Sequence, residues 1–148
     1  MLPEAYQDNP KSGLRQKAQE MMVIKILLVD DQPAVRDGLR MRLELEPDLT
    51  IVGEACDGLE AVALAQTLVP DVVVMDVEMP GLDGIGATRQ LRARTPSMAI
   101  VILSIHCDVA TRERAREAGA TTFVEKRAEI DVLLAEIRRA ALVQQEEH

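Results

Sequence analysis

The chain has almost no aromatic side chains. Its 148 residues include no Trp, one Tyr at position 6 and one Phe at position 123. Because single-stranded nucleic acids and flavin rings are commonly held by aromatic stacking, the sequence offers no platform for either ligand. A basic excess is also lacking, since 17 Lys and Arg face 25 Asp and Glu and the formal net charge is −8. We therefore do not expect this stretch of chain to bind DNA by itself.

Cysteines and long apolar runs are scarce as well. Cys56 and Cys107 form no CxxC pair and show no metal-binding spacing, so no disulfide framework is predicted and a reducing, cytoplasmic location is favoured. We interpret both thiols, and His148, as structural or incidental. The apolar runs at residues 72–75 and 100–103 are far shorter than the roughly 18 to 20 residues of a membrane span. The opening MLPEAYQDNP lacks the pattern of a secretory signal.

What the sequence does contain, from residue 23 onward, is an alternation of short apolar runs with segments of helical period. Strands are predicted at residues 25–29, 49–55, 72–75, 100–103 and 121–125. Helices are predicted after residue 32, at 59–68, through 85 and 91 to about 94, at 109–118, and at about 129–143. Such alternation is typical of βαβ units. The predicted fold is α/β, a flavodoxin-like (βα)5 doubly wound parallel sheet with strand order 2-1-3-4-5.

The two ends of the chain differ from this alternating region. Residues 1–22 are polar, include Pro3 and Pro10, and lack a sustained period, so we expect a flexible N-terminal extension. Met21 and Met22 stand just before the first strand, and a start of translation there is an open alternative. We assign residues 23–143 to one domain and residues 144–148 to a tail or to the start of a linker or tag.

Polar residues stand at the carboxyl ends of the predicted strands. Asp30 and Asp31 follow the first strand, Asp76 the third, Ser104 the fourth and Lys126 the fifth. In a doubly wound sheet these ends form the crevice where ligands bind, so we expect the five side chains to meet there. Taken singly, the Asp pair is equally consistent with a helix cap, and a lone lysine is usually a solvated surface residue.

Three carboxylates in one crevice raise each other's pKa unless a cation joins them. Oxygen ligands with few protein contacts favour Mg²⁺, which keeps several waters and shares its remaining positions with a phosphate. Lys126 can pair with a carboxylate and later with a phosphate oxygen, and Ser104 can donate to another phosphate oxygen. Asp76 is then the natural nucleophile, whose attack on phosphorus gives an aspartyl phosphate.

Five segments, LLVDDQPAVRDGLR, GEACDGLEAV, PDVVVMDVEMPGLDG, VILSIH and GATTFVEK, resemble in order and spacing the receiver domains of bacterial two-component response regulators. The resemblance covers about residues 24–142 and is most like the NarL/LuxR (FixJ) type, which usually precedes a helix-turn-helix DNA-binding domain. It implies that Asp76 is phosphorylated. It also implies that Mg²⁺ is bound directly by Asp31 and Asp76, through water by Asp30, and by the backbone carbonyl of Glu78.

The resemblance implies further roles for residues around this site. Ser104 matches the switch hydroxyl and Phe123 the switch aromatic, although simple core packing is the alternative for Phe123. Glu78 and His106 stand where the family tunes how fast the phosphoryl group is lost. We hypothesise that these two face the attacking water, the alternative being two exposed polar side chains. The charged segment RERARE at residues 112–117 is either a solvated helix face or part of a surface for dimerisation or docking.

These residues predict a signalling switch and not a metabolic enzyme. A sensor histidine kinase would phosphorylate Asp76, with self-phosphorylation from small donors and autodephosphorylation also expected. A phosphorylation-dependent homodimer and a role in transcription regulation are expected, with DNA contacted only through a domain outside this chain. One alternative is a stand-alone receiver. A second alternative, a haloacid-dehalogenase-like phosphohydrolase, requires an Asp at the position of Glu78. An FMN-binding electron carrier requires a phosphate-binding loop after the first strand and aromatic residues on both sides of the flavin ring, and the sequence has neither.

Overall fold

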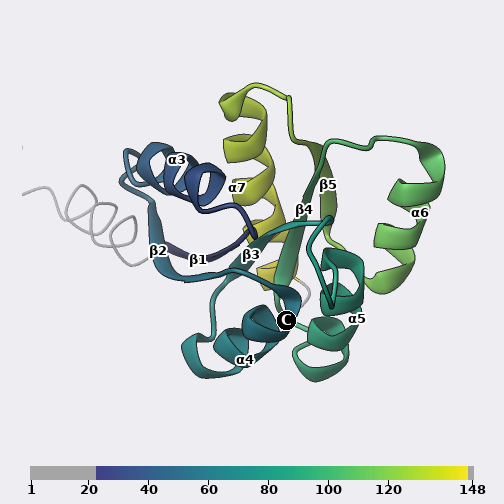
Figure 1. The fold of residues 1–148 in the computed structure, drawn as a ribbon. Helices are drawn as coiled ribbons and strands as arrows, with labels where there is room; N and C mark the ends of the chain where they lie inside the picture. Colours follow the sequence, from purple (N-terminus) through teal and green to yellow (C-terminus); the bar gives the residue numbers. More distant parts are fainter. Residues whose placement is uncertain (1–22, 147–148) are drawn as a thin grey trace, which may run out of the picture.

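Five parallel strands form one sheet in the order β2-β1-β3-β4-β5 within residues 23–146, which the computed structural model describes. The elements are β1 (Ile24–Val29), α3 (Pro33–Leu43), β2 (Leu49–Ala55), α4 (Gly58–Leu68), β3 (Val72–Asp76), α5 (Gly84–Arg94), β4 (Ala99–Ser104), α6 (Val109–Ala118), β5 (Thr122–Glu125) and α7 (Ile130–Glu146). This order confirms the predicted flavodoxin-like (βα)5 fold (Figure 1). The expected extension at residues 1–22 lies outside the described residues, as does His148.

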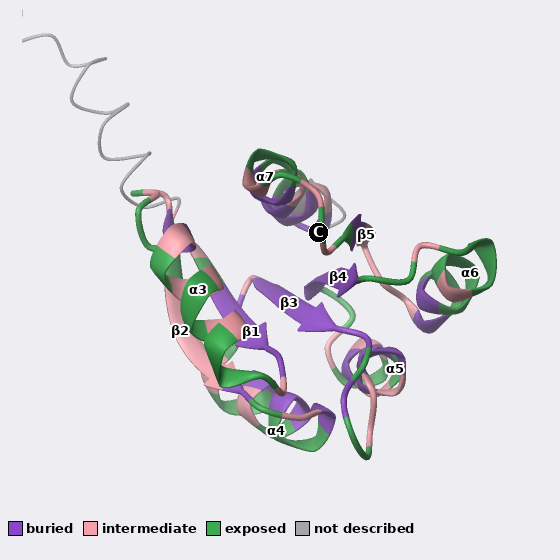
Figure 2. Cartoon of the chain, turned by 45° about the horizontal axis from the view of Figure 1, so that its top comes forward, coloured by how far each residue is buried: buried purple, intermediate pink, exposed green. Residues whose placement is uncertain are grey.

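Helices cover both faces of the sheet. Figure 2 shows α3 and α7 on one face and α4, α5 and α6 on the other, with the buried strands between them. Alternate residues of each strand point to opposite faces, so Leu27 and Val73 pack toward α4 and α5, whereas Ile26 and Val72 pack toward α3 and α7. β3 is buried along its whole length, as the continuous apolar run predicts for a central strand. Within residues 23–146 no helix is both long and apolar enough to cross a membrane.

Aspartates begin three of the helices that follow strands. Asp57, Asp83 and Asp108 occupy the N-cap positions of α4, α5 and α6, and each side chain accepts a hydrogen bond from a backbone N–H in the first turn. α3 begins differently, because Gln32 is at its N-cap without a side-chain bond and Pro33 is its first residue. The interpretation of the acidic pair after β1 as a helix cap is therefore wrong, since neither aspartate is at this N-cap.

Element ends differ slightly from the prediction. β3 and β4 include Asp76 and Ser104 as their last residues, because both still pair along the ladder with the neighbouring strand. The last helix begins one residue later than expected and continues to Glu146, beyond the expected end at residue 143. Residues 144–146 are thus helical. The domain boundary at residue 143 stays a prediction.

Candidate functional site

The register of the parallel strands brings three strand ends side by side. Asp76 pairs with Leu103 and Ser104 pairs with Glu125. The backbone N–H of Lys126 donates to the carbonyl oxygen of Ser104 at 2.8 Å. The acidic end of β3, the hydroxyl at the end of β4 and the lysine after β5 therefore follow one another along the carboxyl edge of the sheet, as predicted from the sequence.

Three carboxylates meet at this edge. Asp30, Asp31 and Asp76 each offer one carboxylate oxygen, and these atoms all lie within 4.8 Å of one another. Asp30 is 2% exposed and Asp76 6% exposed, while Asp31 is half-buried. Carboxylates this close and this poorly solvated repel one another strongly. The arrangement therefore favours a bound cation.

Lys126 supplies part of the required positive charge. Its Nζ lies 3.0 Å from Asp30 Oδ2 and 3.2 Å from Asp76 Oδ2. Burial acts to lower the pKa of Lys126, but the hydrogen bond to Asp30 and the charge of Asp76 outweigh it, so that pKa is raised. Within residues 23–146 it is the one cationic side chain paired with these carboxylates, so negative charge remains in excess.

The balance of charge at Asp76 is unfavourable to its ionised form. Burial raises the pKa of its carboxyl above the ordinary value, and the nearby charge of Asp30 adds to this effect. The Lys126 ammonium and a hydrogen bond from the Glu78 backbone N–H, at 3.3 Å, oppose the rise without cancelling it. A second cation at the cluster would favour the carboxylate form, which is the form that can attack phosphorus.

The hydrogen bonds of the three carboxylates differ in a way that fits the expected metal site. Both oxygens of Asp30 are already engaged, Oδ2 by Lys126 and Oδ1 by the backbone N–H of Gln32 at 2.9 Å. Asp31 has no hydrogen-bonding partner among residues 23–146 and remains free to coordinate. The oxygen donors suit Mg²⁺. Direct binding by Asp31 and Asp76, with Asp30 acting through water, is compatible with these contacts and stays a prediction.

The segment after β4 is tied to the segment after β3. Ser104 is fully buried, and its Oγ accepts a hydrogen bond from the backbone N–H of His106 at 3.0 Å. The Nε2 of His106 lies 3.0 Å from Oε1 of Glu78, and these side chains are 62% and 47% exposed. The sequence identified both residues but not their mutual contact. They form a bridge across the outer side of the site.

Phe123 packs against the core on the side of α4, α5 and α6 but is only partly buried. The guanidinium carbon of Arg112, on α6, lies 5.2 Å from the centroid of its ring. Around Arg112, residues 112–117 are exposed except for Ala115, which is 1% exposed and faces the core. Both interpretations of Phe123 therefore remain, since it packs on the core and carries a polar contact on its outer side.

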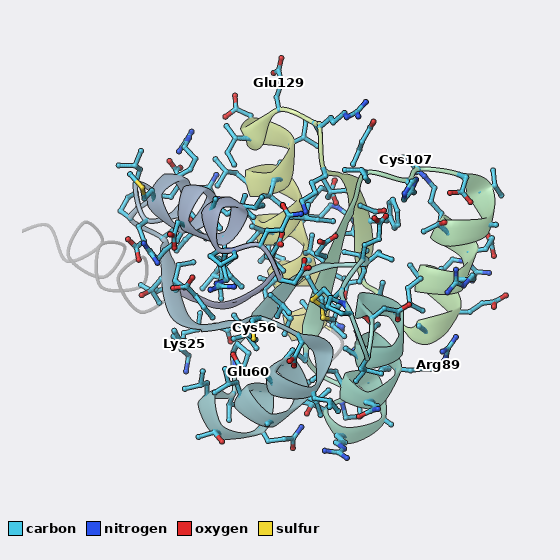
Figure 3. The ribbon with its side chains drawn as sticks, in the orientation of Figure 1. Lys25, Cys56, Glu60, Arg89, Cys107 and Glu129 are labelled. Atoms are coloured by element: carbon cyan, nitrogen blue, oxygen red, sulfur yellow. The ribbon has the colours of Figure 1, made fainter. Side chains whose placement is uncertain are left out.

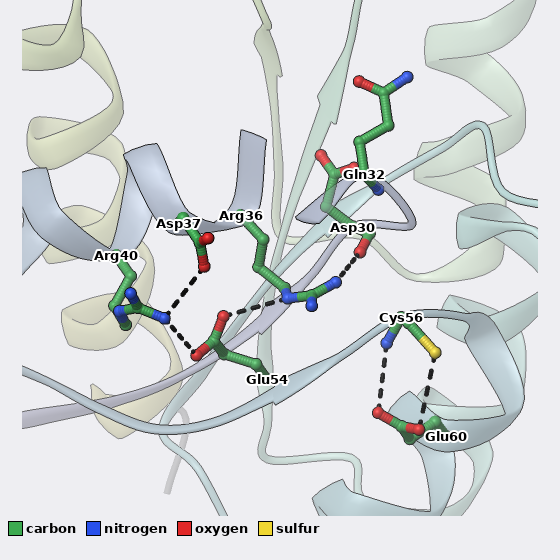
Figure 4. A network of polar contacts seen from close by, with 8 residues as sticks. All are labelled: Asp30, Gln32, Arg36, Asp37, Arg40, Glu54, Cys56 and Glu60. Atoms are coloured by element: carbon green, nitrogen blue, oxygen red, sulfur yellow. Dashed lines mark hydrogen bonds and ion pairs between the residues drawn. The ribbon is translucent and has the colours of Figure 1, made fainter. Parts of the chain in front are cut away.

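Arg36 reaches the site from α3 and was not identified from the sequence. Its Nη1 donates to the backbone carbonyl of Asp30 at 2.7 Å, and its Nε donates to Glu54 on β2 at 3.0 Å (Figure 4). Glu54 also accepts from Arg40, one helical turn further along α3. The spacing of the two arginines is visible in the sequence, but the acceptor on another strand is not. The network holds the turn after β1 in place.

The two cysteines are both free thiols. Cys56 is exposed next to Glu60 in Figure 4, and the charge of Glu60 raises the pKa of its thiol. Cys107 lies in the segment between β4 and α6, at the end of the molecule that also carries Glu129 (Figure 3). A raised thiol pKa lowers the fraction of thiolate, the nucleophilic form, at neutral pH.

Residues 26–138 match the response regulator receiver domain. The chain belongs to this family. The receiver domain is 40% identical to the transcriptional regulatory protein LiaR of Bacillus subtilis, over 80% of this chain and 56% of LiaR. It is 35% identical to the nitrate/nitrite response regulator protein NarL of Escherichia coli K12, over 78% of this chain and 54% of NarL. It is also 42% identical to protein-glutamate methylesterase/protein-glutamine glutaminase 2 of Methanospirillum hungatei, over 70% of this chain and 30% of that protein.

Solved structures agree with this assignment. A LuxR-family two-component response regulator from Aurantimonas sp. SI85-9A1 superposes with a TM-score of 0.79 at 38% identity, covering 81% of this chain and 86% of that chain. The response regulator domain of Thermotoga maritima CheB superposes with a TM-score of 0.74 at 35% identity, covering 80% of this chain and 96% of that chain. These likenesses confirm the resemblance to receivers of the NarL/LuxR type. The receiver domain spans about half the length, or less, of the curated relatives it matches.

Proposed function

We propose that this receiver domain accepts a phosphoryl group on Asp76 from a sensor histidine kinase and thereby acts as a signalling switch. The observation that carries the proposal is the position of Lys126, whose ammonium lies between Asp30 and Asp76 in a cluster of three carboxylates. A buried cluster with excess negative charge and one lysine ammonium is suited to receive a cation and a phosphoryl group together.

The chemistry follows from the side chains present. An Asp76 carboxylate oxygen attacks phosphorus, the bond from phosphorus to the donor atom breaks, and the leaving group takes the electron pair. Lys126, already 3.2 Å from Asp76, moves to a phosphoryl oxygen without leaving the site. Mg²⁺ held by Asp31, Asp76 and the Glu78 carbonyl, with Asp30 through water, would neutralise charge on the phosphoryl oxygens. Ser104 donates to another phosphoryl oxygen.

The output is proposed to follow from movement of Ser104 and Phe123. Ser104 would leave the His106 N–H to reach the phosphoryl group, and Phe123 would turn into the space that this movement vacates. The face formed by α6, β5 and α7 would then change its partner, with a phosphorylation-dependent homodimer as the expected product. The likeness to NarL and LiaR supports an output in transcription through a DNA-binding domain of a longer protein.

The contact between Glu78 and His106 is proposed to set the lifetime of the phosphoryl group. Each side chain is exposed on the outer side of the site, where it can hinder the approach of water. Glu78→Ala and His106→Ala should each shorten the lifetime, because water then reaches the phosphoryl group more easily. The double variant should add little, because either change breaks the same contact. Unchanged lifetimes in both single variants would disprove this role.

Intact-mass measurement tests the proposal for Asp76. The chain is incubated with Mg²⁺ and acetyl phosphate or phosphoramidate, and one added phosphoryl group is expected. The addition should be absent without Mg²⁺ and in Asp76→Asn, whereas Asp83→Asn, an aspartate at the N-cap of α5, should still be modified. Rapid turnover of small phosphate esters with no stable adduct would instead favour a phosphohydrolase.

A further inference from the structure

Arg112 makes two contacts that no other arginine of α6 makes. Its guanidinium carbon lies 5.2 Å from the centre of the Phe123 ring, within the range of a cation–π interaction. Its Nε donates to the backbone carbonyl of Cys107 at 3.3 Å. Arg116 is engaged differently, since its Nη2 pairs with Glu113 at 2.8 Å on the same helix. Arg112 therefore links the ring on β5 to the segment that precedes α6.

The start of α6 holds Arg112 at this position. Asp108 caps the helix, accepting from the backbone N–H of Thr111 at 3.0 Å and from its hydroxyl at 2.8 Å. The backbone N–H of Arg112 donates to the carbonyl of Asp108 at 3.1 Å. Figure 3 shows Cys107 in the segment just before this cap. Because the cap fixes the first turn, the backbone of Arg112 is held where its side chain reaches the Phe123 ring on β5.

Of the two groups that Arg112 contacts, Phe123 is itself proposed to move, and the Cys107 carbonyl belongs to the segment that follows Ser104, the other residue proposed to move. The segment from Ser104 to Cys107 carries the switch hydroxyl, whose Oγ now accepts from the His106 N–H. Phe123 is partly buried, with its outer side against Arg112. If Ser104 shifts toward a phosphoryl group and Phe123 turns inward, both contacts of Arg112 weaken together.

We infer that Arg112 is a positioning residue that favours the unphosphorylated arrangement of this receiver by holding Phe123 and the segment after Ser104 in place. The inference rests on the proposed function, because it assigns Arg112 a role in that switch. A cation–π contact at an exposed site corresponds to about a two- to fivefold change in an equilibrium constant. Since a ligand of the active form binds in proportion to the population of that form, removal of Arg112 should tighten apparent binding by the same factor.

Titration with beryllium trifluoride in the presence of Mg²⁺ measures this population, because the ion mimics a phosphoryl group on a carboxylate. Binding to the full chain is followed by the amide resonances of Ser104 and Phe123. Arg112→Ala is expected to bind about two- to fivefold more tightly than wild type. Arg112→Lys keeps a cation but loses the Nε donor to Cys107, so its affinity for the ion is expected to lie between those of wild type and Arg112→Ala. Arg116→Ala is the matched control and should equal wild type.

A double-mutant cycle separates this role from a structural one. Phe123→Leu removes the ring, so adding Arg112→Ala to it should have a smaller effect than in wild type. If Arg112→Ala binds the ion as wild type does or more weakly, or if its effect is the same with and without the ring, the inference is overturned. If wild type does not bind the ion, or Asp76→Asn binds it equally well, the proposed function fails and the inference fails with it.

Discussion

Replacement of Lys126 by Met tests the charge balance of the site. Met keeps an apolar stem but removes the ammonium that lies 3.0 Å from Asp30 and 3.2 Å from Asp76. Breaking a buried ion pair typically costs about 3 to 5 kcal/mol, because the remaining charge stays buried without a partner. The Lys126 side chain is still 19% exposed and Asp31 is half-buried, so solvent screens part of this loss. We expect the free energy of unfolding to fall by about 2 to 4 kcal/mol near neutral pH without divalent cations.

The loss in this variant should depend on pH with a definite sign. Burial raises the pKa of Asp76 above 3.8 in the folded protein, and Lys126 opposes that rise. An acid with a raised folded pKa destabilises the fold above that pKa, and the penalty vanishes as the pH falls to the unfolded value. Without Lys126 the pKa of Asp76 rises further, so the penalty at neutral pH grows. The difference between wild type and variant should therefore shrink as the pH falls toward 3.8.

Urea unfolding followed by circular dichroism, at neutral and acidic pH, measures the loss in the free energy of unfolding and the direction in which it changes with pH. Lys25→Met is the matched control, because Lys25 is exposed on β1 and its loss should change stability by less than about 0.5 kcal/mol. Mg²⁺ should recover part of the Lys126→Met loss by binding the unpaired carboxylates. A Lys126→Met protein as stable as wild type at neutral pH would refute the charge balance described for this site. So would a loss that is equal at both pH values.

Three other changes have clear expectations from the structure, each checked by the same unfolding assay. Arg138→Gln removes a two-pronged pair with Asp48, 2.8 Å at each bond, and should cost about 1 kcal/mol at neutral pH because the pair is partly exposed. The hydrogen bond from Arg138 lowers the pKa of Asp48, so the pair stabilises the fold above pH 3.8, and this stabilisation is lost as the pH falls through the lowered pKa. A loss of stability in Arg138→Gln that is the same at all pH values would contradict this reasoning. Gly84→Ala should lower the free energy of unfolding by about 2 to 4 kcal/mol, because a Cβ there collides with the backbone carbonyl oxygen of Asp76. Gly38→Ala, in open space on α3, should raise it by about 0.5 to 1 kcal/mol, and equal effects of the two changes would contradict this. Val69→Gly should raise the free energy of unfolding by roughly 0.5 to 1 kcal/mol, because Val69 ends α4 in the left-handed region at φ 47°. A less stable Val69→Gly protein would show that this backbone conformation costs valine little.

The sequence by itself determined the fold and the members of the acidic site. Apolar runs of strand length alternate with helical periods, and this pattern favours a parallel sheet with helices on both faces, which buries both faces of its strands. Because parallel strands joined by helices all end at the same edge, the positions of Asp30, Asp76 and Lys126 at strand ends were enough to predict that they meet. Gly119 ends α6 in the left-handed region at φ 110°, where the sequence supplies the one residue type that adopts this conformation without strain.

Only the tertiary structure decided which polar groups pair with one another. Charged residues make up 28% of the chain, so each arginine or glutamate has many possible partners and the sequence does not rank them. The contacts of His106 with Glu78, and of Arg112 with Phe123, depend on side-chain directions on different elements. The period of buried residues can be recognised from neighbouring residues in the sequence, because each residue faces either core or solvent. The pairing of side chains on different elements cannot be recognised in this way, since it follows from the register and packing that the whole fold imposes.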